Sequence, residues 1–397
     1  MFEAIQKLPP DPILGLTAAY DADPNPRKID LGAGVYKDES GNTPIFEAVK
    51  RAEALWHERE QTKVYIPQPG YADFNTALQA HIFGAGHPAL KAGRIRSVMA
   101  PGGCGGLRLG AELVNRSRPG ANIWLSQPTW NNHVPLLGSA GLKIREYPYY
   151  DAARHVVDFE SMMGALSGID STDVVLLHAC CHNPTGADLN REQWNAVAEL
   201  ATRRGFLPFV DLAYQGLGDG LDEDAYGPRR LAELVPEMLL AYSCSKNFGL
   251  YRDRIGTVAL LAKDAAAAEA AETHVTSIAR GIYSMSPSHG GAIVKTILAD
   301  KALYAVWKKE LDAMRARING LRALLADTLA KKNSPVDFSF VRKQRGLFSM
   351  LGLSKAQMQR LRAEFSIYAV ESSRINIAGI SPKNVDWLAD SIIAVLK

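Results

Sequence analysis

Lys246 is the residue whose surroundings most clearly favour covalent chemistry. It lies in SCSKNFGLYRDR, residues 243–254, directly after the apolar segment MLLAY. A lysine amine attacks a carbonyl group only when it is deprotonated, and a partly desolvated site beside other charges favours that form. An ordinary surface lysine, the competing interpretation, needs no such setting. The sequence therefore indicates an amine that forms a Schiff base.

Polar side chains follow three apolar segments of the chain, VVLL, FLPFV and MLLAY. They are His178, His182 and Asn183 after the first, Asp211 and Tyr214 after the second, and Ser243, Ser245 and Lys246 after the third. Ligand sites in open α/β sheets lie at the carboxyl ends of the strands. We therefore expect these side chains to meet at one edge of a sheet.

Asp211 is the natural anionic partner for such a site. A carboxylate that ends an apolar strand is costly to bury unpaired, and a pyridinium N–H would give it a charge-assisted hydrogen bond. Pyridoxal 5′-phosphate requires both a lysine and an anion against its ring nitrogen. Alternatively, Asp211 caps a turn and Lys246 is solvated. Their joint position at neighbouring strand ends favours the cofactor.

The segment APGGCGGLRLGAEL, residues 100–113, indicates a phosphate site. A glycine-rich turn that opens a helix offers backbone N–H groups and the positive end of the helix dipole. The segment lacks both the GxGxxG spacing of a dinucleotide site and the GxxxxGK[ST] spacing of a P-loop. Ser243 and Arg254 would add donors, although a surface salt bridge is the alternative role for Arg254.

Other chemistries have weaker signals. The CHNPTG segment has no second ligand at metal-binding spacing, so we expect no metal. We interpret His182 as structural, and His178 as a residue that orients Asp211. The absence of GxSxG disfavours serine hydrolysis, and the absence of a strand–GxGxxG–helix opening disfavours a nicotinamide dehydrogenase.

Composition indicates a cytoplasmic protein that binds neither nucleic acid nor membrane. The net charge is +3 with interspersed signs, so no basic stripe for nucleic acid is present. No apolar run reaches the ~18 residues of a membrane span, and the start does not resemble a secretory signal. The four cysteines form no CxxC pair, which is typical of reduced thiols.

The elements needed to position these residues alternate along the middle of the chain. Apolar strands are expected at 122–127, 143–150, 173–181, 206–214, 238–245 and 255–263, with helices between several of them. This pattern predicts a doubly wound α/β layer with a mostly parallel sheet. A long helical stretch, residues 303–332, then precedes the strand-like pieces FSFV and GLFSML and two further helices. These form a second, α+β domain, to which we also assign the N-terminal piece through KIDLGAGVY.

Several motifs together resemble a known family. LGAGVYKDESG, CCHNPTGADL, FVDLAYQG, SCSKNFGLYRDR and YAVESSRINIAG occur in order over nearly the whole chain. The set resembles class I (fold-type I) pyridoxal-phosphate aminotransferases, in the aspartate and aromatic-amino-acid branch. The resemblance implies a seven-stranded, mostly parallel sheet flanked by helices in a large domain, residues 44–312. An N-terminal arm, residues 1–12, and a smaller α+β domain, residues 13–43 and 313–397, would complete the chain.

The resemblance also assigns the cofactor-binding residues. Lys246 would form the Schiff base and move a proton between the substrate Cα and the cofactor, while Asp211 would pair with the ring nitrogen and His178 would support it. The other contacts would be Asn183 and Tyr214 at the phenolic oxygen, Trp130 at the ring face, Gly103, Cys104, Ser243 and Arg254 at the phosphate, and Tyr65 at the phosphate of a neighbouring subunit. Cys104 departs from the hydroxyl residue of many relatives, and a thiol is a poor phosphate donor.

Substrate binding follows from the same resemblance. Arg374 would grip the α-carboxylate, Gly34 would line it through its backbone, and Arg280 would bind a distal carboxylate across a homodimer with shared active sites. Trp130 and Asn183 would also border the substrate. Met285 stands where aspartate-selective relatives often carry asparagine, which leaves the preferred amino donor open.

The activity implied is transfer of an amino group from an aromatic amino acid (Phe, Tyr or Trp) or aspartate to 2-oxoglutarate, in a ping-pong cycle of the aldehyde and amine forms of the cofactor. A strictly aspartate-specific aminotransferase is the first alternative. A carbon–sulfur lyase on the same scaffold is a second alternative. A non-catalytic sensor is the third, and it is disfavoured because no helix-turn-helix segment precedes residue 11.

Overall fold

The computed structural model describes residues 1–8 and 12–397 and divides the chain into two compact units. The small unit comprises Met1–Thr43, Pro184–Gly186 and Arg317–Lys397, and the large unit comprises Pro44–Asn183 and Ala187–Ala316. Residues 9–11 lie outside the described residues, so the predicted N-terminal arm, 1–12, is described only in part. Its first element is the short 3₁₀ helix η1, Phe2–Ala4.

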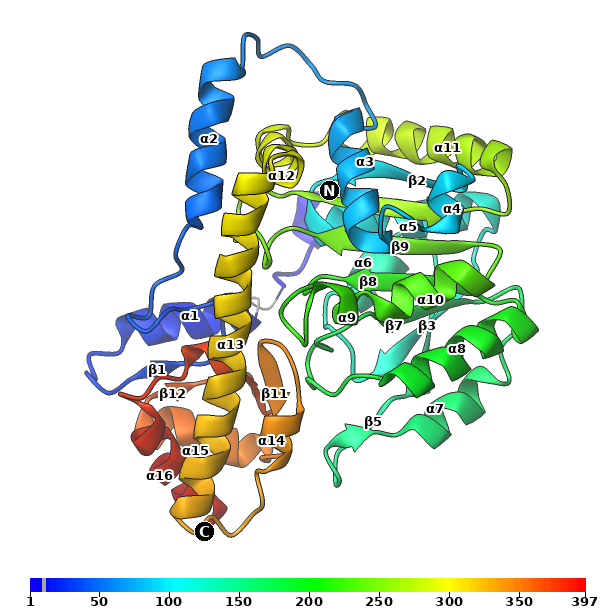
Figure 1. Cartoon of the computed structure of the whole chain (residues 1–397). Coiled ribbons are helices and arrows are strands. Elements are labelled where there is room, and N and C mark those ends of the chain that lie inside the picture. Colours follow the sequence, from blue (N-terminus) through cyan, green and yellow to red (C-terminus); the bar gives the residue numbers. More distant parts are fainter. Residues whose placement is uncertain (9–11) are drawn as a thin grey trace. The chain divides into compact units, whose positions relative to one another are not determined.

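The large unit is built on one seven-stranded sheet (Figure 1). In spatial order its strands are β2 (Ile95–Ala100), β10 (Gly256–Leu261), β9 (Met238–Ser243), β8 (Leu207–Leu212), β7 (Val174–His178), β3 (Asn122–Gln127) and β4 (Lys143–Pro148). β10 is antiparallel to both of its neighbours, and every other pair is parallel. This confirms the predicted mostly parallel seven-stranded sheet.

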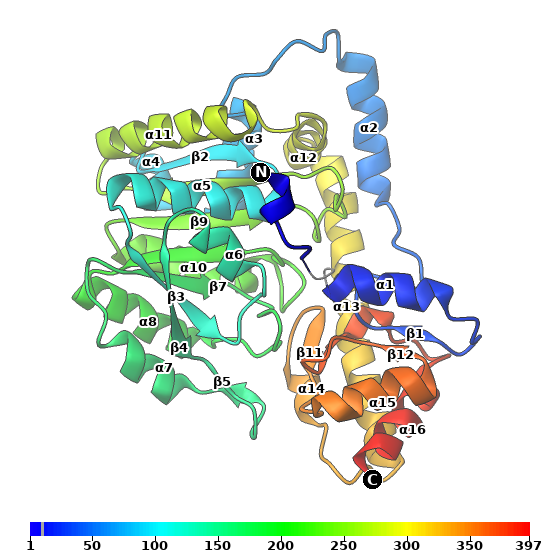
Figure 2. The same cartoon turned by 180° about the vertical axis from the view of Figure 1, so that it is seen from behind.

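Helices cover both faces of this sheet, which explains why its central strands are almost continuously apolar. Helices α5, α6 and α11 lie on one face, and α3, α8 and α10 lie on the other (Figures 1 and 2). The helices of the large unit are α2 (Glu47–Arg59), α3 (Ala72–Phe83), α4 (Pro88–Lys91), α5 (Gly102–Ser117), α6 (His133–Gly138), α7 (Phe159–Leu166), α8 (Arg191–Arg204), α9 (Leu221–Asp224), α10 (Tyr226–Leu234), α11 (Ala265–Tyr283) and α12 (His289–Ala299). A small hairpin, β5 (Tyr150–Asp151) with β6 (Val156–Val157), follows β4.

The glycines of α5 let this helix lie unusually close to the sheet. A Cβ atom added at Gly106 would lie 2.7 Å from the carbonyl oxygen of Thr257 on β10, and one added at Gly110 would overlap the ring of Phe209 on β8. Neither position has space for a side chain. The glycine-rich segment therefore sets the depth at which the amino end of α5 meets the strand ends.

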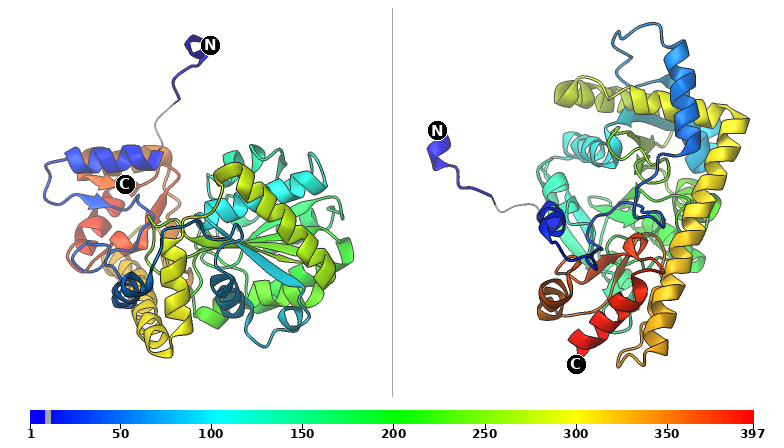
Figure 3. Two further views of the ribbon diagram at one scale, coloured as in Figure 1. Left: turned by 90° about the horizontal axis from the view of Figure 1, so that it is seen from above. Right: turned by 90° about the vertical axis from the view of Figure 1, so that its left-hand side faces the viewer.

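The small unit contains two short strand pairs and several helices. β1 (Ile29–Asp30) pairs in parallel with β12 (Ile367–Tyr368), and β11 (Phe348–Met350) pairs antiparallel with β13 (Arg374–Asn376). The remaining elements are α1 (Pro12–Ala22), α14 (Phe340–Lys343), α15 (Lys355–Phe365), η2 (Ile377–Gly379) and α16 (Val385–Leu396). The long helix α13 (Lys301–Lys331) is continuous, and each unit includes part of it (Figure 3).

One secondary-structure prediction was wrong. FSFV, residues 338–341, was expected to be a strand, but it leads into the helix α14. The carboxylate of Asp337 accepts hydrogen bonds from the backbone N–H and the hydroxyl of Ser339, both at 2.8 Å. Such a local turn draws the backbone away from an extended conformation. The buried Arg322 of α13 then donates to the carbonyl of Val341, at 3.1 Å.

Within the described residues, no helix combines the length and the apolar character that crossing a membrane would require.

Candidate active site

The backbone around Lys246 is anchored on both sides by buried groups of the large unit. Asn247 Nδ2 donates to the hydroxyl of Tyr242 at 2.6 Å, and Trp307 Nε1 donates to the carbonyl of Asn247 at 2.8 Å. The ring of Phe248 stacks on that of Trp307 with centroids 4.6 Å apart. The side chain of Lys246 therefore extends from a fixed point just beyond the end of β9.

The amine of Lys246 lies in a setting that favours its neutral form. Its Nζ atom is 4.8 Å from the centroid of the Tyr214 ring. Burial lowers the pKa of Lys246, and the positive charge of Arg254 acts in the same direction, whereas Asp211 opposes both. The net effect is a pKa below the usual range, which increases the fraction of nucleophilic amine near neutral pH.

Asp211 is the buried anion of the site. It lies on β8, and its Oδ2 atom is 3.1 Å from His133 Nε2. Burial by itself would raise the pKa of Asp211, but the hydrogen bond from His133 and the charge of Lys246 hold this pKa below its ordinary value. Asp211 is therefore an ionised carboxylate with a fixed orientation.

A chain of hydrogen-bonded groups ends on Asp211. An ionised carboxylate only accepts, so His133 Nε2 must donate to it. Thr129 Oγ1 lies 2.8 Å from His133 Nδ1 and 3.2 Å from His178 Nε2. The hydroxyl of Thr129 thus links the two rings, and the chain runs from His178 through Thr129 and His133 to the carboxylate.

His178 was predicted to orient Asp211, and in the structure the hydrogen bond to the Asp211 carboxylate comes from His133. His178 pairs in register with Asp211 on the neighbouring strand, and Thr129 and His133 connect it to the carboxylate. The sequence reasoning missed His133 and Thr129 as functional residues. The signal for them was present in QPTWNNH, where a threonine and a histidine stand four residues apart directly after a strand.

His178 belongs to a stack of rings, of which His182 and Tyr149 are buried. Its ring stacks on that of His182 with centroids 4.1 Å apart, and His182 stacks in turn on Tyr149 at 4.2 Å. His182 Nε2 lies 3.0 Å from the hydroxyl of Ser126. Burial lowers the pKa of His178 to about 3, and the charge of His133 contributes to the shift.

This lowered pKa predicts a loss of stability in mild acid. The unfolded chain protonates His178 near its ordinary pKa of 6.5, whereas the folded chain keeps it neutral down to about 3. The unfolded state therefore binds the extra proton as the pH falls from 6.5. We expect the free energy of unfolding to be smaller at pH 5.5 than at pH 8 by on the order of 1 kcal/mol through this residue alone. The free energy of unfolding, measured by urea at both pH values, should change with pH by that much less in His178→Gln than in the wild type. An identical dependence in both proteins would contradict the assignment.

The amino end of α5 forms a cradle for an anion. Gly102 opens the helix with φ +73°, and a Cβ atom added there would lie 2.5 Å from Nη2 of Arg254. Arg254, itself in a left-handed conformation with φ +54°, donates to Ser245 Oγ at 3.4 Å and to the carbonyl of Tyr251 at 2.8 Å. Within the described residues Arg254 forms no ion pair with a carboxylate. Its guanidinium group, the helix dipole and Ser243 are therefore available to a phosphate.

Cys104 lies in the first turn of α5. Asn132 Nδ2 is 3.8 Å from its sulfur atom, and burial raises the pKa of the Cys104 thiol despite the opposing charge of Arg254. The thiol is consequently neutral, and a neutral thiol is a weak hydrogen-bond donor.

The other predicted residues divide between the two units. In the large unit, Asn183 is buried, Trp130 is half-buried with its ring edge-on to His133, and Tyr65 is 85% exposed. Arg280 is also exposed, and it donates to the hydroxyl of Ser284. Neither Tyr65 nor Arg280 forms a hydrogen bond or ion pair with the residues around Lys246 in the part of the chain that the structure describes.

Gly34 and Arg374 belong to the small unit. Arg374 is buried on β13, donates to the carbonyl of Gly32 at 3.0 Å and lies over the ring of Phe348 at 4.3 Å. A Cβ atom added at Gly34 would lie 3.0 Å from the same ring. Gly34 and Arg374 thus share one neighbour, which gives this part of the small unit a defined shape.

An α/β sheet with a partly buried amine, a buried carboxylate and an anion cradle beyond its strand ends defines a Schiff-base enzyme that binds a phosphorylated cofactor. The family model for aminotransferases of class I and II matches residues 26–392, and the chain belongs to that family. It is a pyridoxal-phosphate-dependent aminotransferase.

Individual relatives match over their whole length. The aspartate aminotransferase of Salmonella typhi is 47% identical over 396 residues, with all of both chains covered. The aromatic-amino-acid aminotransferase of Pseudomonas aeruginosa is 45% identical, with 99% of this chain and 98% of the relative covered. The crystal structure of the aromatic-amino-acid aminotransferase from Burkholderia pseudomallei, covalently bound to pyridoxal phosphate, has a TM-score of 0.98 and 41% identity, with 100% of each chain covered.

The residues of the large unit fit this cofactor. Pyridoxal 5′-phosphate needs an amine, an anion for its ring nitrogen and donors for a phosphate, and Lys246, Asp211 and the cradle at Gly102 and Arg254 provide them. Gly102 has no Cβ atom, so the guanidinium group of Arg254 lies directly against the amino end of α5.

Proposed function

We propose that this enzyme transfers the amino group of an aromatic amino acid or of aspartate to 2-oxoglutarate. The names of its relatives support both kinds of donor, since aspartate and aromatic-amino-acid aminotransferases match with similar identity. The observation that carries the proposal is the exposed guanidinium group of Arg280, whose hydrogen bond goes to the neutral hydroxyl of Ser284. Such a group can bind the distal carboxylate of aspartate, or it can turn toward solvent and leave space for the ring of an aromatic substrate.

The residues around Lys246 have distinct tasks in this proposal. The bound cofactor supplies an electron sink for the substrate Cα. Lys246 Nζ removes the proton from that carbon. The same amine then delivers the proton to the cofactor carbon that is bonded to the transferred nitrogen. Asp211 holds a proton on the cofactor's ring nitrogen, and the chain of Thr129 and His133 keeps the carboxylate ionised and oriented.

The other contacts carry over from the family resemblance. Asn183 and Tyr214 would bind the phenolic oxygen, and Trp130 would cover the ring. Gly103, Cys104, Ser243 and Arg254 would hold the phosphate, with the backbone of α5 and Arg254 compensating for the neutral thiol. Arg374 would bind the substrate α-carboxylate as a two-pronged partner, and Gly34 would line it.

Arg280 is the residue that separates the two classes of donor. Arg280→Leu removes the charge-assisted partner of a second carboxylate and leaves an apolar side chain that a ring tolerates. We expect kcat/KM for aspartate to fall by at least about 10²-fold and that for phenylalanine by less than about tenfold. Steady-state kinetics with both donors check this result. Equal losses for the two donors would contradict the role, and wild-type enzyme without phenylalanine turnover would favour the strictly aspartate-specific alternative.

We also propose a homodimer in which Tyr65 and Arg280 serve the site of the partner subunit. The support is the exposure of large apolar side chains in the large unit, including Val64 at 72%, Tyr65 at 85% and Ile282 at 50%. Exposed large aromatic and aliphatic groups are typical of interfaces. The four free cysteines are consistent with a cytoplasmic location.

A mixed dimer tests this shared site. Lys246→Ala and Arg280→Leu are each expected to be nearly inactive with aspartate. If Arg280 acts across the interface, a dimer with one subunit of each kind has one site with both defects and one intact site. Refolding an equal mixture should restore about a quarter of the wild-type aspartate turnover. Turnover that stays at the level of the separate variants would contradict the shared arrangement.

A further inference from the structure

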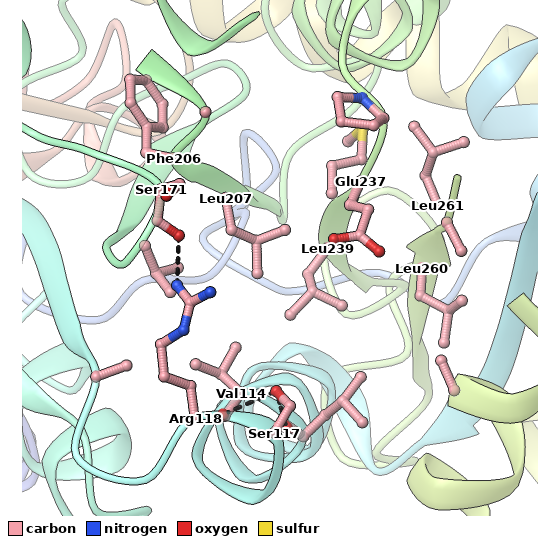
Figure 4. A pocket seen from close by; sticks show the side chains of 18 of the residues that line it. Val114, Ser117, Arg118, Ser171, Phe206, Leu207, Glu237, Leu239, Leu260 and Leu261 are labelled. Atoms are coloured by element: carbon pink, nitrogen blue, oxygen red, sulfur yellow. Dashed lines mark hydrogen bonds between the residues drawn. The ribbon is translucent and has the colours of Figure 1, made fainter. Parts of the chain in front are cut away.

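A cavity of the large unit lies at the end of the sheet opposite to Lys246. Figure 4 shows the side chains that line this cavity. It is bordered by the residues that begin three parallel strands, Val174 of β7, Leu207 of β8 and Met238 of β9, and by Leu261, which ends the antiparallel β10. Asp211 and Lys246 belong to the other ends of the same strands. The cavity is therefore separate from the aminotransferase site.

The inner wall of this cavity is apolar and buried. Val174, Phe206, Leu239 and Leu261 line it, and each is at most 4% exposed. Helices α5, α8 and α11 contribute further apolar side chains around the strand ends. The cavity volume of about 350 Å³ lies within the range of small-molecule sites.

Two opposite charges at the mouth, Arg118 and Glu237, form no salt bridge within the described residues, and the charge of Arg118 also helps to lower the pKa of Asp170, after the hydrogen bonds from Thr172. Arg118, just after α5, donates to the carbonyl oxygen of Ser171 through one nitrogen, and Glu237 lies just before β9. Both are exposed, and within residues 1–8 and 12–397 neither forms an ion pair with a charged side chain, including each other. Figure 4 shows the two charged groups reaching toward the cavity from different sides, with Leu207 and Leu239 between them in this view.

We propose that this cavity binds a small zwitterion whose carboxylate and ammonium groups are separated by an apolar body. The carboxylate would pair with the remaining donors of Arg118, the ammonium group would pair with Glu237, and the apolar body would cover Leu207 and Leu239. An ω-amino acid and a dipeptide of apolar residues share this chemistry. Aminotransferase substrates differ, because their amine and α-carboxylate stand on one carbon atom.

The two charges favour this class over simpler ligands. A monocarboxylate would pair with Arg118 but would place its apolar chain against the carboxylate of Glu237, which would lose hydration without gaining a partner. An apolar amine would pair with Glu237 but would place its apolar chain against the guanidinium group of Arg118. That group would then lose hydration without gaining a partner. A ligand with both charges satisfies both residues and also buries apolar surface.

Ligand-observed NMR titration of the holoenzyme with 6-aminohexanoic acid tests the proposal. We expect a Kd of about 1 mM or tighter. Arg118→Gln and Glu237→Gln should each weaken binding at least about tenfold, since each removes one charge-assisted contact. The matched controls are Arg116→Gln and Glu233→Gln, which change exposed charges outside the cavity and should leave binding unchanged. Transamination should be unchanged in all four variants, which shows that each is folded.

Further probes define the ligand. Hexanoic acid and hexylamine should each bind at least about tenfold more weakly than 6-aminohexanoic acid. If leucyl-leucine binds and its affinity falls in both cavity variants, the ligand class includes apolar dipeptides. If only 6-aminohexanoic acid binds, the ligand class is limited to ω-amino acids. Absence of binding, equal binding to the cavity variants, or equal binding of hexanoic acid would overturn the proposal.

Discussion

Lys246→Ala is expected to lower kcat by at least about 10²–10⁴-fold, the usual contribution of a positioned acid–base group, while the protein stays folded. The variant loses the amine that holds the cofactor and moves the substrate proton. The surrounding backbone keeps its own anchors, because the bonds of Asn247 and the stacking of Phe248 on Trp307 do not involve the lysine side chain. Single-turnover kinetics with the cofactor added in excess give the measurement.

Two matched variants separate the amine from its charge. Lys246→Arg keeps a positive charge beside Asp211 but cannot form an imine, so it should be as inactive as the alanine variant. Lys263→Ala removes an exposed lysine just after β10 and should keep full turnover. Substantial activity in Lys246→Arg would show that charge alone is sufficient and would refute the nucleophilic role.

Asp211→Asn is expected to lower kcat by at least about 10²-fold, as removal of one preorganised electrostatic group typically does. The amide is neutral, so it cannot hold a proton on the cofactor's ring nitrogen. It also disrupts the chain from His178 through Thr129 and His133, since the last donor loses its anionic acceptor. Rates measured with saturating cofactor distinguish slow chemistry from weak cofactor binding.

A surface carboxylate provides the control for this variant. Asp222 is exposed and pairs with Arg229 at 2.8 Å, and exposed ion pairs contribute little. Asp222→Asn should therefore retain kcat within about twofold. If Asp211→Asn kept kcat within tenfold of the wild type, the carboxylate would not be the anion that the reaction requires.

The centre of the sheet could be predicted because its strands are buried on both faces. VVLLH, FLPFV and MLLAY have no polar alternation, and the residues that end them include Asp211 and Lys246. Parallel pairing then brings those ends to one edge. Apolar periodicity gave no sign of β2, whose sequence IRSVMA mixes polar and apolar residues, or of the antiparallel direction of β10. The expected number of strands came from the family resemblance.

The partner of Asp211 could not be predicted because it depends on tertiary packing. His178 is the register neighbour of the carboxylate, and sequence reasoning therefore favours it. His133 comes from α6, a helix of six residues whose place over the sheet is set by packing rather than by a local pattern. The turn at Asp337 is a comparable case, since its side-chain hydrogen bonds overrode the apolar pattern of FSFV.

Borohydride reduction followed by peptide mass mapping tests the central assignment most directly. A reducible link between the cofactor and one lysine becomes permanent on reduction, and the modified peptide identifies that lysine. We predict a single cofactor mass on the peptide that contains Lys246, and loss of this adduct after preincubation with an amino donor. Reduced protein that carries the cofactor on another lysine, or carries none after incubation with pyridoxal 5′-phosphate, would contradict the account.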